Sequence, residues 1–240
     1  MRDSRDSRPH DSTFRPALTR RESLALVGGA TAWLVAGGVP FPVRAAAETL
    51  ECVARPEQTE GPYFVDEGLD RSDLRSDPAD GSVRDGVALA LALRVSKGSA
   101  RSCAPLAGAK VDLWHCDARG VYSDVRDPGF ETVGSKFLRG YQLTAEDGIA
   151  RFVTIYPGWY PSRAVHIHFK IRSGRAEFTS QLYFDDALSD RVLASAPYAR
   201  PGRRTRNEDD GIFSDGGEQL VLKVEPAPSG YVAEFNVRLV

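Results

Sequence analysis

The sequence predicts an all-β protein, a β-sandwich with Greek-key-like antiparallel strands and long loops. From about residue 87 onward, short stretches in which apolar and polar residues alternate recur along the chain, and such alternation is typical of half-buried strands. Turn residues separate these stretches. Only residues 186–196 have a pattern that favours a short helix. Evenly spaced short strands with little helix are typical of two packed sheets.

The expected strands, in chain order, are residues 87–95, 110–116, 140–144, 149–156, 164–172, 177–184, 219–225 and 231–239. Asp147-Gly148 predicts a hairpin turn between the third and fourth strands, because Asp-Gly suits the backbone of a tight turn. Ser173-Gly174 predicts the same between the fifth and sixth. Residues 66–85, rich in Asp, Arg and Ser, are expected to form a surface loop.

The first 47 residues are interpreted as an export signal, and residues 48–240 as one domain with a single core. Arg20-Arg21 precedes a Gly/Ala-rich apolar run over residues 24–39, and Ala45-Ala46-Ala47 resembles a cleavage site. The paired arginines favour the twin-arginine route over an ordinary secretory signal. We therefore expect an exported protein, periplasmic or extracellular, with no stable membrane anchor after processing.

The charge balance argues against nucleic acid as a partner. The whole chain has a net charge of −2, and without residues 1–47 it keeps 24 basic and 29 acidic residues. No basic stripe with interleaved aromatic residues is present in the sequence. The acidic runs at residues 185–186 and 208–210 are expected to lie on solvated loops. Nothing in the sequence indicates the oligomeric state.

Three cysteines bear on the fold, because export permits a disulfide. Cys52 and Cys103 lie in loop-like segments beside strands, whereas Cys116 ends an apolar strand. We therefore predict a bridge between Cys52 and Cys103 and a buried free thiol at Cys116.

The candidate functional residues cluster in one stretch, residues 158–169. Residues two apart on a strand point to the same face, so His166 and His168 can present two imidazoles to one metal ion. Tyr160 precedes them on a Gly/Pro turn. Imidazole binds several transition metals, and a phenolic oxygen nearby favours a hard, highly charged ion. The alternative is two half-buried imidazoles that only hydrogen-bond to their neighbours.

The chain has four histidines, and a third imidazole for this site is not expected from the other two, His10 and His115. His115 shares a strand face with Val111 and Leu113, which indicates a histidine that faces the core or supports a ligand from behind. A metal held by His166 and His168 must therefore take its other ligands from Tyr, Asp, Glu or Cys.

Four segments together resemble one family, the intradiol ring-cleavage dioxygenases, and they occur in the family's order. One is the stretch at residues 158–169, and the other three are residues 58–64 (Gln-Thr-Glu-Gly-Pro-Tyr-Phe), 111–122 (Val-Asp-Leu-Trp-His-Cys-Asp-Ala-Arg-Gly-Val-Tyr) and 179–184 (Thr-Ser-Gln-Leu-Tyr-Phe). The resemblance covers about residues 50–185 and implies a β-sandwich fold.

The resemblance also implies the site. Its metal ligands would be two phenolates and two imidazoles around non-haem ferric iron, Fe(3+): Tyr122, Tyr160, His166 and His168. It implies catalytic roles for Arg163 and Tyr160, Arg163 beside the substrate ring and Tyr160 as a displaced ligand that takes a proton. It places Gln181, Pro62, Tyr63 and Arg163 at the substrate. Of these, Gln181 and Tyr63 could otherwise be ordinary sheet and core residues.

By the same resemblance, the substrate would be a small catechol-type diol, the co-substrate O2, and the product a muconate-type dicarboxylic acid. Only five residues separate Tyr160 from His166, where the protocatechuate enzymes have a longer loop. The pocket is therefore expected to be less covered. Trp159 before the tyrosine resembles the secreted branch of the family.

Two other functions are compatible with parts of the pattern. A cupin-type metal oxygenase also uses a His-x-His strand, but it usually takes a further histidine from a later strand, and no histidine follows His168. An exported, non-catalytic β-sandwich that binds carbohydrate or a partner would need only structural histidines. Colour would separate them, since ferric iron bound by tyrosinate absorbs visible light.

Overall fold

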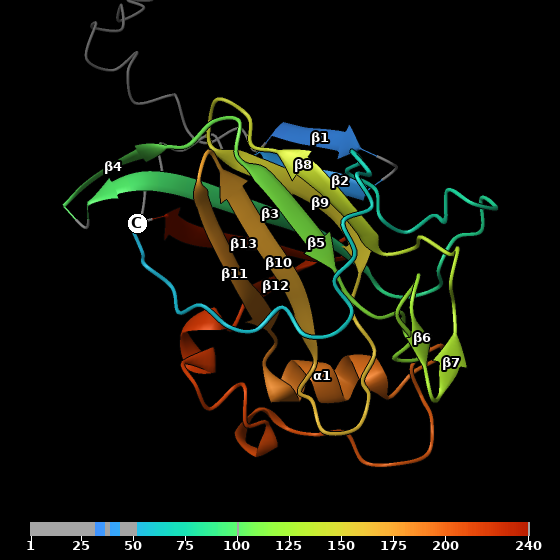
Figure 1. The fold of residues 1–240 in the computed structure, drawn as a ribbon. Helices are drawn as coiled ribbons and strands as arrows, with labels where there is room; N and C mark the ends of the chain where they lie inside the picture. The colour runs from blue at the N-terminus through green and yellow to red at the C-terminus, as the bar shows by residue number, and fades with distance from the viewer. Residues whose placement is uncertain (1–31, 37–38, 44–51, 100, 240) are drawn as a thin grey trace, which may run out of the picture.

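Two β-sheets packed face to face form the body of the domain (Figure 1). The structure is a computed structural model that describes residues 32–36, 39–43, 52–99 and 101–239. The first sheet is fully antiparallel, and its strands in spatial order are β11 (Ala176–Tyr183), β10 (His166–Ser173), β5 (Lys110–Trp114) and β8 (Arg139–Leu143). The all-β sandwich expected from the sequence is confirmed.

The second sheet is built around its longest strand, β3 (Ala88–Ser99), and its other members are β12 (Lys223–Ala227), β13 (Gly230–Leu239), β4 (Ser102–Pro105) and β9 (Ile149–Ile155). β9 and β4 pair with successive parts of the same edge of β3. β13 pairs with the other edge in parallel, so the expectation of antiparallel strands throughout was wrong at this pair. Most of the domain separates these two strands in sequence, so no hairpin fixes their direction.

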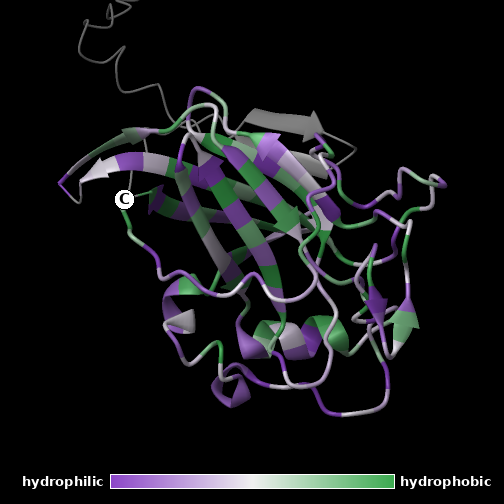
Figure 2. Cartoon of the chain, viewed as in Figure 1, coloured by the Kyte–Doolittle hydropathy of each residue, from purple (hydrophilic) through white to green (hydrophobic). Residues whose placement is uncertain are grey.

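The core lies between the sheets and follows from the alternation along each strand. Leu89, Leu91 and Leu93 of β3 are fully buried and belong to the same apolar cluster as Ile167 and Phe169 of β10. Figure 2 shows the corresponding bands of hydrophobic and hydrophilic residues along the strands. The face of β10 that carries its polar residues therefore points away from the core.

The helices and smaller hairpins lie outside the sheets (Figure 1). The helix α1 (Asp186–Leu193) is shorter than expected; it begins after Asp185, whose carboxylate accepts a hydrogen bond from the Leu188 amide. The remaining elements are β1 (Ala32–Ala36), β2 (Val39–Val43), β6 (Arg126–Asp127), β7 (Phe130–Glu131) and the 3-10 turns η1 (Asn207–Asp209) and η2 (Gly217–Leu220). None of the helices in the described part of the chain has the length and apolar character needed to cross a membrane.

Three local expectations were wrong. The Asp147-Gly148 turn forms, but it joins β8 in one sheet to β9 in the other, so it closes no hairpin. The strand expected at 219–225 begins at Lys223, because the preceding residues form η2. The 66–85 segment is irregular, yet it is not only a surface loop: Leu74 is fully buried and its amide donates to the Val153 carbonyl of β9 at 2.9 Å.

The hairpin expected at Ser173-Gly174 is confirmed, because β10 and β11 pair along their whole length with Ser173 opposite Ala176. The disulfide is confirmed as well: Cys52 is bonded to Cys103 of β4, with 5.8 Å between their Cα atoms. Cys116 is a buried free thiol. Most of the expected export signal lies outside the described residues, and within it β1 and β2 pair with each other.

Candidate metal centre and substrate cavity

The two histidines lie on a strand that is held from both sides. β10 is hydrogen-bonded to β5 and β11, which opposes His168 with Trp114 on one side and Gln181 on the other. Because Ile167 faces the core, His166 and His168 face outward, where the loops of the first sheet cover them; each is only 2% exposed. The indole of Trp114 stacks on the His168 ring, with an interplanar angle of 7°.

The two tyrosines come from loops that touch each other. Tyr122 lies in the loop after β5, and Tyr160 in the turn before β10. The loops meet at Gly120, where an added Cβ would lie 2.3 Å from the carbonyl oxygen of Trp159. Gly120 also has a φ of +83°, in the left-handed region that favours glycine. Only glycine therefore permits the close approach that brings the two phenols together.

The four side chains converge on one point. His166 Nε2 lies 3.1 Å from His168 Nε2 and 3.1 Å from the Tyr160 hydroxyl oxygen. The Tyr122 hydroxyl oxygen is 3.5 Å from both His166 Nε2 and the Tyr160 oxygen. Residues separated by up to 46 positions in the sequence thus bring two nitrogen and two oxygen donors into one cluster.

These spacings fit a metal ion as the common partner. Nitrogen and oxygen ligands about 2.0–2.2 Å from a metal, at angles of roughly 90–110°, are about 2.8–3.6 Å apart. The tautomer of His166 agrees, since its Nδ1–H donates to the Ala164 carbonyl at 2.6 Å and leaves the Nε2 lone pair facing the cluster. The four residues could therefore hold a metal without rearrangement.

Without a bound cation, burial determines the protonation of the two phenols and the two imidazoles. It raises the pKa of the Tyr122 and Tyr160 phenols well above the ordinary value. It lowers the pKa of His166 to about 3, with Arg163 adding to the effect, and lowers that of His168 further below the ordinary value. The imidazoles are thus neutral at pH 7, as metal ligation requires, whereas the phenols need a bound cation to ionise.

Arg163 reaches the cluster from the turn that carries Tyr160. Its Nη1 lies 3.5 Å from His166 Nε2, its Nη2 donates to Gln181 Oε1, and its Nε donates to Asp210 Oδ2 at 3.0 Å. Burial acts to lower the pKa of Arg163, but Tyr160 and Asp210 outweigh it and raise the pKa above its ordinary value. A permanent positive charge therefore lies at the edge of the cluster.

Asp210 was missed by the sequence reasoning, which expected residues 208–210 to lie on a solvated loop. Its side chain is only 1% exposed and accepts hydrogen bonds from the Ala164 amide and from its own neighbour Ile212, both at 2.8 Å. Its partners are up to 47 residues away in sequence, so no local pattern marks it. Of the other acidic run, Asp185 is exposed as expected, whereas Asp186 is half-buried, begins α1 and pairs with Arg204.

A cavity of about 360 Å³ opens beside the two phenols. Its lining comes from the Tyr122 loop, the Tyr160 turn and neighbouring segments: Tyr63, Arg119, Gly120, Val121, Tyr122, Asp127, Gly129, Phe130, Tyr160, Pro161 and Arg200. Tyr63 lies in the wall, where its hydroxyl donates to Asp127 Oδ2 at 2.7 Å. Pro62 and Gln181 do not line this cavity; Pro62 is exposed, and Gln181 is buried behind Arg163.

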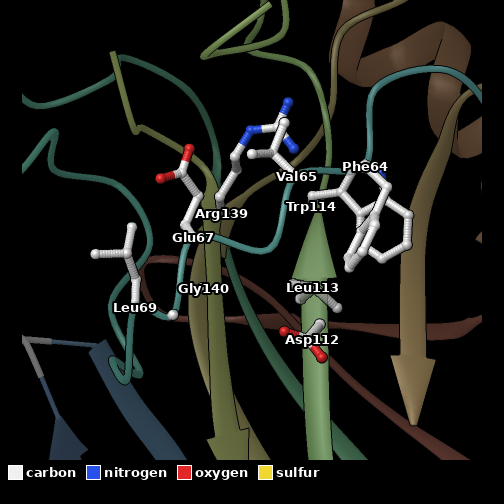
Figure 3. A pocket seen from close by; sticks show the side chains of 10 residues that line it. Phe64, Val65, Glu67, Leu69, Asp112, Leu113, Trp114, Arg139 and Gly140 are labelled. Carbon is white, nitrogen blue, oxygen red and sulfur yellow. The ribbon is translucent and has the colours of Figure 1, made fainter. Parts of the chain in front are cut away.

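A second, much smaller hollow of about 10 Å³ is lined in part by Trp114, whose indole stacks on His168 (Figure 3). It has room for about one water molecule. Phe64 packs against Trp114 here, with 4.8 Å between the ring centroids, and Arg139 of β8 lies on the other side of β5's end. The Arg139 guanidinium donates to the Tyr63 carbonyl at 2.6 Å and to the Ser123 carbonyl, which ties two cavity segments to the sheet.

His115 is not part of the cluster. Its ring is fully buried on the core side of the chain after β5, with Nδ1 2.8 Å from the Cys116 carbonyl oxygen and Nε2 2.6 Å from Thr154 Oγ1. Both ring nitrogens therefore have partners in the core. The expectation of a core-facing histidine is confirmed, and it makes none of the contacts that would orient a ligand.

Known proteins match the part of the chain that forms the two sheets and the cluster. Residues 59–211 match the family model described as "Dioxygenase". A solved structure from Tetranychus urticae, an intradiol ring-cleavage dioxygenase, is 32% identical over 78% of this chain and 94% of its own, with a TM-score of 0.69. The dioxygenase domain of a carbohydrate-binding fusion protein from Streptomyces sp. SirexAA-E is 30% identical, covers 78% of this chain and 98% of that one, and has a TM-score of 0.58.

Among curated proteins, the catechol 1,2-dioxygenase of Acinetobacter baylyi is 27% identical over 68% of this chain and 60% of its own length. The chlorocatechol 1,2-dioxygenase of Pseudomonas putida is 30% identical over 33% of this chain and 36% of its own. The chain thus spans between about a third and three fifths of the length of the curated relatives it matches.

Proposed function

Because the chain belongs to the intradiol ring-cleavage dioxygenases, we propose that it uses ferric iron to cleave a catechol-type aromatic diol with O2. Cleavage would fall between the two carbons that carry the hydroxyl groups and give a muconate-type dicarboxylic acid. The family generally depends on non-haem iron. The convergence of Tyr122, Tyr160, His166 and His168 carries the proposal for this chain.

The donor set supports iron in its ferric state over other metals. Two phenolic oxygens are hard donors, and with a hydroxide they balance three positive charges, so the buried site needs no further counter-charge. Bound ferric iron would supply the Lewis acidity that withdraws electrons from a chelated diol. The stacking of the Trp114 indole on the His168 ring supports a fixed orientation of this imidazole.

The protein's own groups have distinct roles in this proposal. Tyr160 is the less buried of the two tyrosines and lines the cavity, which supports its oxygen as the acceptor of a proton from an arriving diol. Arg163 would stabilise negative charge that develops on the ring as the reaction proceeds. Gln181 and Asp210 hold two of its nitrogens, so its remaining nitrogen stays directed at the cluster.

Purified protein tests the proposal directly. It should contain one ferric ion per chain, be reddish, and consume oxygen with at least one of catechol, protocatechuate, hydroxyquinol and caffeate, with the product identified by mass. His168→Ala should lose most of the iron and the colour. Tyr156→Phe is the matched control, because its buried hydroxyl bonds Ser189 away from the cluster. A colourless wild-type protein with full activity would refute the assignment of Tyr122 and Tyr160 as iron ligands.

We also propose export, by the twin-arginine route, to the periplasm or the extracellular space. The disulfide between Cys52 and Cys103 supports an oxidising compartment. The route suits a metal enzyme, because it carries folded proteins and iron could be loaded beforehand. Fractionation of cells that express the whole chain, with Arg20-Arg21 replaced by Lys-Lys in a second strain, tests it; unchanged export of the variant would exclude the twin-arginine route.

A further inference from the structure

The cavity has two arginines in its lining, and they differ in what they contact. Arg200 is engaged: its Nη1 donates to the Arg119 carbonyl at 2.7 Å, its Nη2 donates to the Trp159 carbonyl, and its guanidinium lies 4.0 Å over the Trp159 ring. These contacts fix the rim beside the Tyr160 turn. Arg200 therefore acts as a structural clamp with little capacity to bind a ligand.

Arg119 is fixed only through its backbone. Its amide donates to Asp117 Oδ1 at 2.9 Å and its carbonyl accepts from Arg200. Within the described part of the chain, no hydrogen bond or ion pair engages its guanidinium, and the residue is exposed. A cation with five unused N–H donors thus lines the cavity three residues before Tyr122.

Two other lining residues, Asp127 and Phe130, have a different character. Phe130 is apolar, and both oxygens of Asp127 already accept hydrogen bonds, one from the Tyr63 hydroxyl at 2.7 Å and one from the Gly129 amide at 2.8 Å. An anionic group would be repelled from Asp127 and attracted to Arg119. Of these charged lining residues, Arg119 is therefore the one that favours an anion.

The cavity is also larger than a bare ring requires. A cavity of about 150 Å³ accommodates a benzene molecule, whereas this one has about 360 Å³ beside the phenols. A diol bound at the Tyr122–Tyr160 end leaves room for a substituent that extends from the ring. Because a guanidinium matches a carboxylate with two parallel hydrogen bonds, Arg119 suits a substituent of that kind.

We propose that Arg119 is a specificity residue that selects aromatic diols bearing a carboxylate, on the ring or on a short side chain, over neutral diols. The inference rests on the proposed function for its substrate class. Beyond the proposed function, it specifies that the ring substituent is negatively charged and that Arg119 recognises it.

The test compares 3,4-dihydroxybenzoate with its methyl ester, which keeps the diol and removes the charge. The wild-type ratio of kcat/KM for acid over ester should exceed one and fall about five- to tenfold in Arg119→Gln, as expected for a bidentate pair between a guanidinium and a carboxylate. Arg203→Gln is the matched control: it removes the same charge from an arginine that is 84% exposed and absent from the cavity lining. Its ratio should stay within about twofold of wild type.

A binding arm keeps this inference separable from the proposed function. 4-Hydroxybenzoate and its methyl ester have one hydroxyl each and so are not substrates for diol cleavage; calorimetry should show the acid binding more tightly to wild type but not to Arg119→Gln. Equal ratios in the two proteins, or an equal drop in Arg203→Gln, would overturn the inference while leaving the proposed function intact. Failure to cleave any diol would instead overturn the proposed function, and the binding arm would still decide the role of Arg119.

Discussion

Replacing Asp210 with asparagine removes the buried charge that anchors Arg163, and its cost can be worked out from the contacts. Oδ2 accepts from the Ala164 amide and from Arg163 Nε, and Oδ1 accepts from the Ile212 amide. An asparagine of the same shape keeps one oxygen. Its NH₂ group must then face either the Ala164 or the Ile212 amide, which leaves one buried N–H without an acceptor.

An unsatisfied buried donor costs about 1–3 kcal/mol, and the weaker bond to Arg163 adds about 1 kcal/mol. We therefore expect Asp210→Asn to lower the free energy of unfolding by about 2–4 kcal/mol. In a domain of this size, each kcal/mol lowers Tm by about 2–4 °C, so the loss should be about 4–16 °C.

Differential scanning calorimetry at pH 7 measures this loss, with Asp209→Asn as the control. Asp209 is the sequence neighbour of Asp210, but its side chain is 52% exposed and its ion pair with Arg203 is long, at 3.8 Å. Its replacement should therefore change the free energy of unfolding by no more than about 0.5 kcal/mol. Equal Tm values for the two variants would refute the assignment of a structural anchor to Asp210.

Three further predictions concern separate parts of the molecule. Arg163→Lys should keep its iron but lose about a hundredfold in kcat, because one ammonium cannot replace a donor fork; normal turnover at full iron content would return Arg163 to a structural role. Burial lowers the pKa of His115 from 6.5 to about 4, so its neutral form stabilises the fold above pH 6.5 and this stability is lost as pH falls toward 4. In urea unfolding, the free energy of unfolding of wild type should therefore fall by about 2 kcal/mol more than that of His115→Gln between pH 7 and pH 5. An equal fall in the two proteins would contradict this. Replacing Cys52 and Cys103 together with serine should cost about 3–4 kcal/mol for a bridge that spans 51 residues, measured by the same unfolding; an unchanged midpoint would argue against the bridge in the exported protein.

The sequence could predict those features that depend on local periodicity. The alternation in β10 indicated the strand and the shared face of His166 and His168, and the alternation in the 111–116 run indicated the core position of His115, because successive side chains of a strand point to opposite faces. Ser173-Gly174 predicted a hairpin because these residues suit a tight turn between two strands. The positions of Tyr122 and Tyr160 came from the resemblance, since loop residues have no periodicity.

The features that could not be predicted depend on pairing between distant segments. Asp147-Gly148 fixes a tight turn, but the sheet that each flanking strand joins is decided by packing, and here the two strands join different sheets. Asp210 is one of several acidic residues in its run until Arg163 approaches it. β4 (Ser102–Pro105) is too short to show a pattern and is held in part by the bond at Cys103.

The division of the cluster between a central strand and two loops has a consequence for how it opens. His168 lies where β10 is paired with both β5 and β11, and His166 is paired with Tyr183 of β11, so the two histidines should separate only when this sheet opens. Tyr122 and Tyr160 lie on loops, which open at lower free energy. Transient opening would thus part the phenols from the imidazoles while the imidazole pair stays assembled, leaving half of the cluster preformed for any returning ligand.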